Sequence, residues 1–95
     1  MFIVLLRFSD NRKDAGRLMQ GHNDWIRRGF DDGVFLLTGN LQPQQGGAIV
    51  AHDTSLSALQ DRVNGDPFVA GNVVRAEILE ITPTRVSDLL RFLNA

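Results

Sequence analysis

Hydrophobic and polar positions repeat along this chain with two different periods, and the changes of period divide it into strands and helices. Residues 2–8 are almost continuously apolar and rich in β-branched and aromatic side chains, which favours a buried strand. From residue 15 to residue 30, one set of positions recurs at three- and four-residue spacing, the period of a helix face. This set is Ala15, Leu18, Met19, His22, Ile26 and Phe30. The pattern predicts a strand followed by a long helix that ends near Asp32.

The predicted helix has a start signal and an unusual glycine content. Asn11 and Asp14 have the spacing of an N-cap residue and an acidic third residue. Gly16, Gly21 and Gly29 each weaken a helix by roughly 1 kcal/mol relative to alanine. We therefore expect close backbone contacts at these glycines, or a helix that is stabilised mainly by its packing.

The second half of the chain predicts a hairpin, a helix and a last strand. Residues 34–38, continuing loosely to 41, and residues 47–51 are apolar runs separated by a turn-rich segment at 42–46. A helix with an apolar stripe follows at 56–63, capped by Thr54 or Ser55. A short connector then leads to a strand over 73–82. Beyond it, residues 86–93 have the apolar stripe of a C-terminal helix.

The resulting order is β-α-β-β-α-β with a C-terminal helix, which is the ferredoxin-like plan of the α+β class. It predicts a four-stranded antiparallel sheet with both main helices on one face. The length suits one core, so residues 1–95 are expected to form a single domain.

The other face of this sheet is expected to need a cover of its own. Both faces of strand 2–8 and of strand 73–82 are mainly apolar, whereas a strand with one wet face alternates apolar and polar residues. Either a second subunit or the C-terminal helix can supply the cover. We favour a homodimer that packs through the open sheet face, because a large apolar sheet surface exposed on a monomer usually marks an interface.

Composition and charge exclude several classes of function. The formal net charge of -1 argues against a nucleic-acid surface, which needs a basic excess on one face. The absence of cysteine excludes thiolate metal sites and cysteine nucleophiles, and no phosphate-binding glycine motif occurs. The apolar start is too short to span a membrane and lacks the flanks of a signal peptide. We expect a cytoplasmic protein without metal, cofactor, nucleic-acid or membrane partner.

His22 is the candidate for chemistry, because a polar ring on an apolar helix face carries a desolvation cost. A histidine has an ordinary pKa of about 6.5 and can therefore exchange protons near neutral pH as a general acid or base. The alternative is a core histidine whose ring is satisfied by a backbone partner.

Three local signatures then give a resemblance along nearly the whole chain. They are His22 followed by Trp25 and Ile26, the segment 33–39 leading to Gly46-Gly47, and Asp66-Pro67-Phe68 with Ala70-Gly71 close behind. In this order the chain resembles the YciI-like (YCII-related) family of small dimeric α+β barrel proteins. The resemblance implies that His22 and Asp66 form a dyad in a pocket that binds a small molecule.

The resemblance also implies substrate contacts. Where the family has Ser-Gly-Pro at the end of the second strand, this chain has Thr38, Gly39 and Asn40, so the hydroxyl is kept and the proline is replaced. Pro67 and Phe68 are further candidates for the pocket wall.

The remaining candidates each have a structural alternative. Arg7 can bind an anionic substrate group, or it can reach solvent from the end of its strand. Asp66 can also serve as a turn or capping residue. Arg12-Lys13 is expected to be a solvated helix end, and His52 is expected at the surface.

Two functions therefore remain open from the sequence. One is an enzyme, a lyase or isomerase that works without a cofactor, in which His22 and Asp66 catalyse proton transfer, isomerisation or elimination. The other is a non-catalytic module for ligand binding or assembly.

Overall fold

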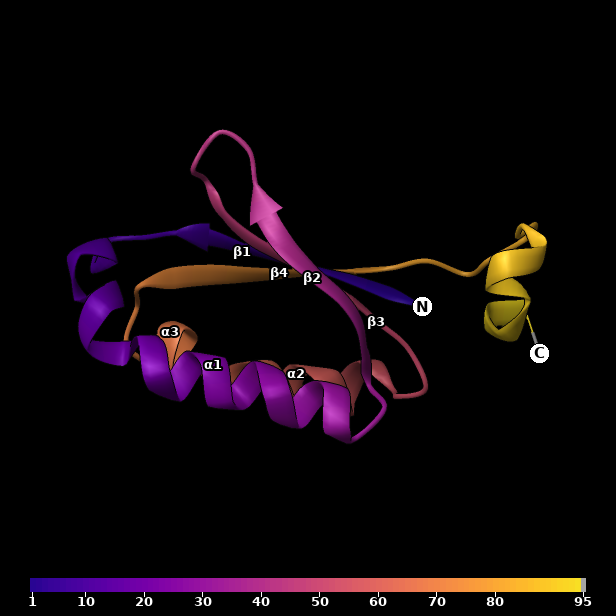
Figure 1. Ribbon diagram of the computed structural model, residues 1–95, viewed down its shortest axis with the longest axis horizontal. Coiled ribbons are helices and arrows are strands. Elements are labelled where there is room, and N and C mark those ends of the chain that lie inside the picture. Colours follow the sequence, from indigo (N-terminus) through magenta and orange to yellow (C-terminus); the bar gives the residue numbers. More distant parts are fainter. Residues whose placement is uncertain (95) are drawn as a thin grey trace.

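A computed structural model describes residues 1–94, which form a four-stranded antiparallel sheet with its helices on one side (Figure 1). The elements are β1 (Phe2–Phe8), η1 (Arg12–Asp14), α1 (Ala15–Asp31), β2 (Phe35–Leu41), β3 (Gly46–Ala51), α2 (Leu56–Asn64), α3 (Pro67–Ala70), β4 (Val74–Glu80) and η2 (Asp88–Asn94). The strand order is β2-β3-β1-β4 and every neighbouring pair is antiparallel. The ferredoxin-like α+β fold predicted from the sequence is therefore confirmed.

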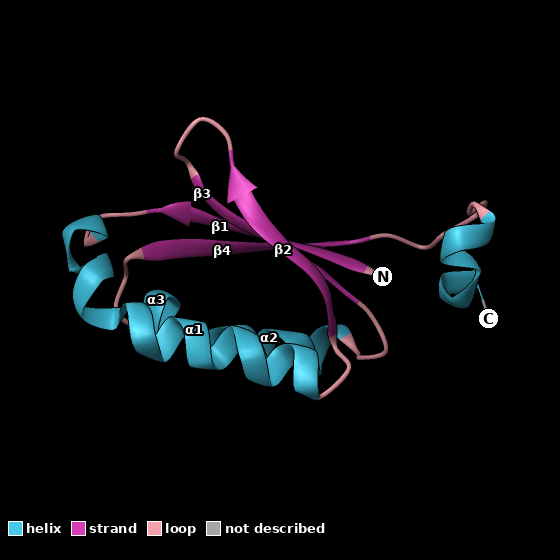
Figure 2. Ribbon diagram, viewed as in Figure 1, coloured by secondary structure: helices cyan, strands magenta, loops and turns pink. Residues whose placement is uncertain are grey.

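The core lies between the sheet and the helix layer, as Figure 2 shows by separating the two layers. β1 is central to it because Phe2, Val4 and Leu6 alternate along the strand and all point toward the helices, where they are buried. Trp25 of α1 and Leu59 of α2 close the core from the other side. Burial of these apolar side chains is the main force that holds the two layers together.

The opposite sheet face is apolar around Ile3, carries Arg7 and Glu77 further along, and is not covered by any of residues 1–94. Ile3 of β1 lies between Val50 of β3 and Leu79 of β4 in the sheet register. Leu37 of β2 has 55% of its surface exposed, and Leu79 has 41%. The sequence predicted that both faces of these strands are mainly apolar, and the exposed leucines show this on the open sheet face.

The helix ends agree with prediction at α2 and differ at α1. The Ser55 hydroxyl accepts the N–H of Ala58 at 3.1 Å, so Ser55 is the one of the two predicted caps that α2 uses. Asn11, in contrast, does not cap α1, because a turn of 3-10 helix separates it from Ala15. The Asn11 side chain instead donates to the carbonyl of Gly71 at 3.1 Å. This hydrogen bond links the loop after β1 to the loop before β4.

Two of the three glycines of α1 make the close contacts that their helix cost suggested. A Cβ at Gly29 would collide with the ring of Phe35, so only glycine lets β2 approach the helix here. A Cβ at Gly21 would lie 3.1 Å from Cγ of Pro67. Gly16 has open space around it, so no contact explains this third glycine.

The C-terminal segment does not cover the open sheet face. η2 is a 3-10 segment with a kink at Leu90, not the regular helix predicted for 86–93. Figure 1 shows it beyond the end of the sheet, and there the ring of Phe92 meets that of His52 at a centroid distance of 5.5 Å. Leu89 remains 88% exposed. Within residues 1–94, no helix combines the length and apolarity needed to cross a membrane.

Candidate functional site

The site forms where α1 and α3 cross, and the backbone contact there explains why its two key residues meet. Gly21 of α1 lets Pro67 at the start of α3 approach the helix closely. His22 follows Gly21 and Asp66 precedes Pro67, so the same approach brings their side chains together. The two residues are 44 positions apart in the chain, and only the fold joins them.

A short hydrogen bond connects the pair. Nδ1 of His22 lies 2.8 Å from Oδ1 of Asp66, whose side chain is fully buried. The His22 side chain is 13% exposed, so the imidazole stands between the buried carboxylate and the surface. A buried carboxylate needs such partners, because desolvation of an unpaired charge is costly.

Asp66 also has a structural task. Its Oδ1 accepts the backbone N–H of Phe68 at 3.0 Å, which caps the first turn of α3, and Pro67 occupies the first helical position. The capping role and the contact with His22 therefore coexist on one oxygen. Oδ2 is buried and has no hydrogen-bond partner among residues 1–94.

Aromatic rings hold the imidazole from the side. The ring of Phe68 is stacked on that of His22, with centroids 3.9 Å apart and an interplanar angle of 4°. Trp25 lies further away, at 6.0 Å and 25°. Its indole N–H donates to the carbonyl of Arg62 at 2.9 Å, which anchors Trp25 to α2. These contacts leave the imidazole little freedom to turn.

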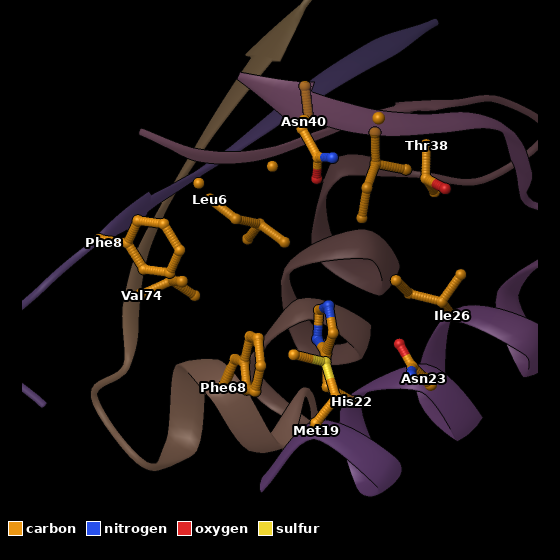
Figure 3. A pocket seen from close by; sticks show the side chains of 15 residues that line it. Leu6, Phe8, Met19, His22, Asn23, Ile26, Thr38, Asn40, Phe68 and Val74 are labelled. Atoms are coloured by element: carbon orange, nitrogen blue, oxygen red, sulfur yellow. The ribbon is translucent and has the colours of Figure 1, made fainter. Parts of the chain in front are cut away.

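His22 faces a pocket of about 410 Å³ between α1 and one end of the sheet. Figure 3 shows the imidazole rising from the helix toward the strands, with Thr38 and Asn40 on the opposite wall. The lining residues are Leu6, Phe8, Met19, His22, Asn23, Ile26, Thr38, Gly39, Asn40, Gly46, Gly47, Ala48, Ile49, Phe68 and Val74. This volume lies at the small end of the range of roughly 300–1,000 Å³ for ligand pockets. Mostly apolar walls with a few convergent polar groups suit a small organic molecule.

A bulge in β2 decides that Thr38 and Asn40 reach this pocket. Phe35 pairs with Ala51 and Thr38 pairs with Ile49, with a register shift after Phe35. In an uninterrupted strand, residues three apart point to opposite faces. The bulge places Phe35 in the core and Thr38 on the same side of the sheet, where it lines the pocket.

The structure brings most of the predicted site residues together. His22, Thr38, Gly39, Asn40 and Phe68 line the pocket, and Asp66 lies behind His22. Pro67 does not line it.

Arg7 lies apart from the site. Strand alternation sends Leu6 and Phe8 to the pocket and Arg7 to the open sheet face. Its side chain is 51% exposed there and pairs with Glu77 at 3.8 Å. Of the two roles considered for Arg7, the structure agrees with a side chain that reaches solvent.

Sequence reasoning gave several pocket residues no role. Met19 and Ile26 share the helical face of His22, and Leu6 and Phe8 share a strand face, so periodicity contained the signal for all four. Asn23 carried no such signal, because it lies beside the apolar stripe.

Metal ligands do not gather at this site or elsewhere in the described part of the chain. Among residues 1–94, no group of three or more histidine, aspartate or glutamate side chains is placed to hold a metal ion.

Comparison with known proteins gives a structural likeness. No family model matches the chain, and no curated protein matches it in sequence. Among solved structures, it is similar to the 5-chloro-2-hydroxyhydroquinone dehydrochlorinase of Burkholderia phenoliruptrix in complex with 2,5-dihydroxybenzoquinone. The TM-score is 0.68 at 11% identity, over 85% of this chain and 93% of that one. At this identity the likeness shows the shared fold.

Proposed function

We propose that this chain is a YCII-like small-molecule enzyme in which His22 transfers a proton to or from a ligand in the pocket. The observation that carries the proposal is the bond of 2.8 Å between Nδ1 of His22 and Oδ1 of Asp66. With Nδ1 engaged, Nε2 is the ring nitrogen left for a bound molecule. A histidine held in this way by a buried carboxylate is a general acid–base group with one free nitrogen.

The roles of the neighbouring groups follow from their positions. Asp66 accepts the Nδ1 proton, which leaves the lone pair of neutral His22 on Nε2 and allows it to act as a base. When Nε2 takes a proton, the Asp66 charge stabilises the imidazolium. Phe68 fixes the plane of the ring through its stacking contact. Thr38 and Asn40, on the opposite wall, supply hydrogen-bond partners that orient the ligand.

These roles fit isomerisation or elimination. In an isomerisation, His22 takes a proton from one ligand atom and returns it to another. In an elimination, it takes the proton while the leaving group departs with its bonding electron pair. The structurally similar protein is by name a dehydrochlorinase that was solved with a dihydroxybenzoquinone, so one protein of this fold is associated with an elimination. We extend only the reaction class to this chain.

Turnover tests the proposal most directly. A thermal-shift screen of small hydroxylated aromatics and quinones, including 2,5-dihydroxybenzoquinone, first finds ligands of the wild-type protein. Isomerisation, elimination or solvent-deuterium exchange of each ligand is then followed by NMR. His22→Gln is expected to lower the rate by about 10²–10⁴, the usual contribution of a general acid–base group.

The control for this experiment is His52→Gln, because His52 lies outside the pocket and the variant loses the same type of side chain. Unchanged turnover in a folded His22→Gln protein would refute the catalytic role. Ligand binding without any turnover in the wild-type protein would favour the non-catalytic ligand-binding module.

We also propose that the open sheet face joins two copies of this chain into a homodimer. Support comes from the exposed apolar side chains of Leu37 and Leu79 and the partly exposed Ile3 between the neighbouring strands. An apolar sheet surface exposed to water is unfavourable, and a two-fold axis lets the same face cover itself.

A further inference from the structure

We propose that Arg12 forms an anion-binding subsite beside the pocket, so that the ligand is a small carboxylate with a planar, uncharged end near His22. This inference rests on the proposed function, since it names the ligand class of the same site. The first observation is a side hollow of about 230 Å³ lined by Phe8, Arg12, Asn40, Gln42, Gln44 and Gly46.

The side hollow and the main pocket adjoin each other. Phe8, Asn40 and Gly46 line both of them, so a molecule that occupies the pocket can extend directly into the hollow. Figure 3 shows Phe8 on the side of the pocket away from Ile26, and Asn40 on the strand wall above it. The proposal places one ligand across both, with one end near His22 and the other near Arg12.

Arg12 is held in place by an aromatic ring and not by an acid. Its guanidinium carbon lies 4.0 Å from the centroid of the Phe8 ring, a cation–π contact that orients the planar group. Among residues 1–94, no carboxylate lies within ion-pair distance of Arg12. The neighbouring acid Asp14 is paired with Arg17 at 3.5 Å. The positive charge of Arg12 is thus available to a ligand.

The charge distribution over the two cavities points to an anionic group at this end. No aspartate or glutamate lines either cavity, and Arg12 is the only permanently charged residue that does so within the described range. The amides of Gln42 and Gln44 can add hydrogen bonds to a carboxylate held there. The walls near His22 are apolar and aromatic instead, which favours an uncharged planar group. Arg12 is exposed at a helix end, as the sequence predicted, and the proposed subsite adds a role to that position.

Two probes of equal size test the subsite. The Kd of 4-hydroxyphenylacetate and of its uncharged amide, 4-hydroxyphenylacetamide, is measured by NMR titration at low ionic strength. Wild-type protein is expected to bind the carboxylate at least threefold more tightly, as an exposed charge-assisted contact of this kind provides. Added salt is expected to reduce this preference, because the subsite is open to solvent.

Substitutions then locate the preference. Arg12→Gln should abolish it, whereas Lys13→Gln, which removes the same charge one residue away and lines neither cavity, should leave it intact. Equal affinity of the two probes for the wild type, a preference that survives in Arg12→Gln, or failure of both probes to bind at millimolar concentration would overturn the proposal. His22→Gln should retain the preference for the carboxylate. Loss of turnover and loss of the anion preference are therefore separate outcomes. The proposed catalysis can be refuted while the proposed anion-binding subsite is confirmed.

Discussion

Phe68 contacts the His22–Asp66 pair twice, once with its ring and once with its backbone. Its ring is stacked on the imidazole of His22, while its N–H donates to the same Asp66 oxygen that binds His22. The orientation of the imidazole thus depends on two residues of one short turn, Asp66 and Phe68. Changes at this turn are expected to affect both folding and chemistry, and suitable variants can separate the two effects.

Replacement of Asp66 separates its capping role from its charge. Asp66→Ala removes the cap of α3 and the partner of His22, so we expect a loss of about 2 kcal/mol in the free energy of unfolding. Asp66→Asn retains an oxygen that can cap the helix and should lose less than about 1 kcal/mol. Urea unfolding measures both values. Equal stability of the two variants would show that the cap contributes nothing.

Loss of the stacking contact between Phe68 and His22 is expected to lower turnover by more than any partial unfolding of the variant explains. Phe68→Leu keeps an apolar side chain on α3 but removes the flat surface against His22, so the imidazole can tilt. We expect turnover to fall by about tenfold or more, because misplacement of a catalytic group by about 1 Å is costly. Rates of the folded protein are measured well below its melting temperature. Phe35→Leu is the control, since Phe35 is equally an aromatic residue of the core but does not line the pocket.

The glycines of α1 give a pair of opposite predictions. Gly29→Ala introduces a methyl group into the ring of Phe35 and should destabilise the protein by about 1–3 kcal/mol, despite the better helix propensity of alanine. Gly16→Ala meets nothing within 4 Å and should stabilise it by up to about 1 kcal/mol. Thermal unfolding of the two variants decides the matter. A neutral Gly29→Ala variant would contradict the close packing of α1 on β2.

The proposed dimer predicts a specific sensitivity to charge on the open sheet face. Leu79→Lys places a charge on the edge strand β4, next to the apolar Ile3 of the open sheet face, and is expected to convert the dimer to a monomer in sedimentation experiments at micromolar concentration. Leu56→Lys, at 39% exposure compared with 41% for Leu79, changes a similarly exposed leucine on α2 and should leave the dimer intact. A wild-type protein that sediments as a monomer would refute the proposal.

Periodicity was sufficient to predict the fold. The change between strand and helix periods gave the order of the elements, and the two apolar faces of β1 indicated an uncovered sheet surface. The contact of His22 with Asp66 was not accessible in this way, because no local pattern relates residues 44 positions apart. Its prediction depended on the family resemblance.

The errors of prediction have local physical causes. Arg7 was a candidate for an anionic substrate group with solvent exposure as the alternative, and strand alternation directs it away from the pocket. The bulge after Phe35 had no signal in the sequence, although it decides which side chains of β2 meet the ligand. The expected cap at Asn11 failed because a turn of 3-10 helix lies between Asn11 and α1, and the Asn11 side chain binds the carbonyl of Gly71, 60 positions away.

The double task of Asp66 has a consequence for how relatives of this chain can diverge. A lineage that abandons the chemistry no longer needs His22, and that position is then free to accept an apolar residue. The first turn of α3 still requires a cap at position 66, but asparagine or serine can supply it without a buried charge that has lost its histidine partner. Relatives that lack the histidine are therefore expected to carry an uncharged capping residue at position 66 more often than an aspartate.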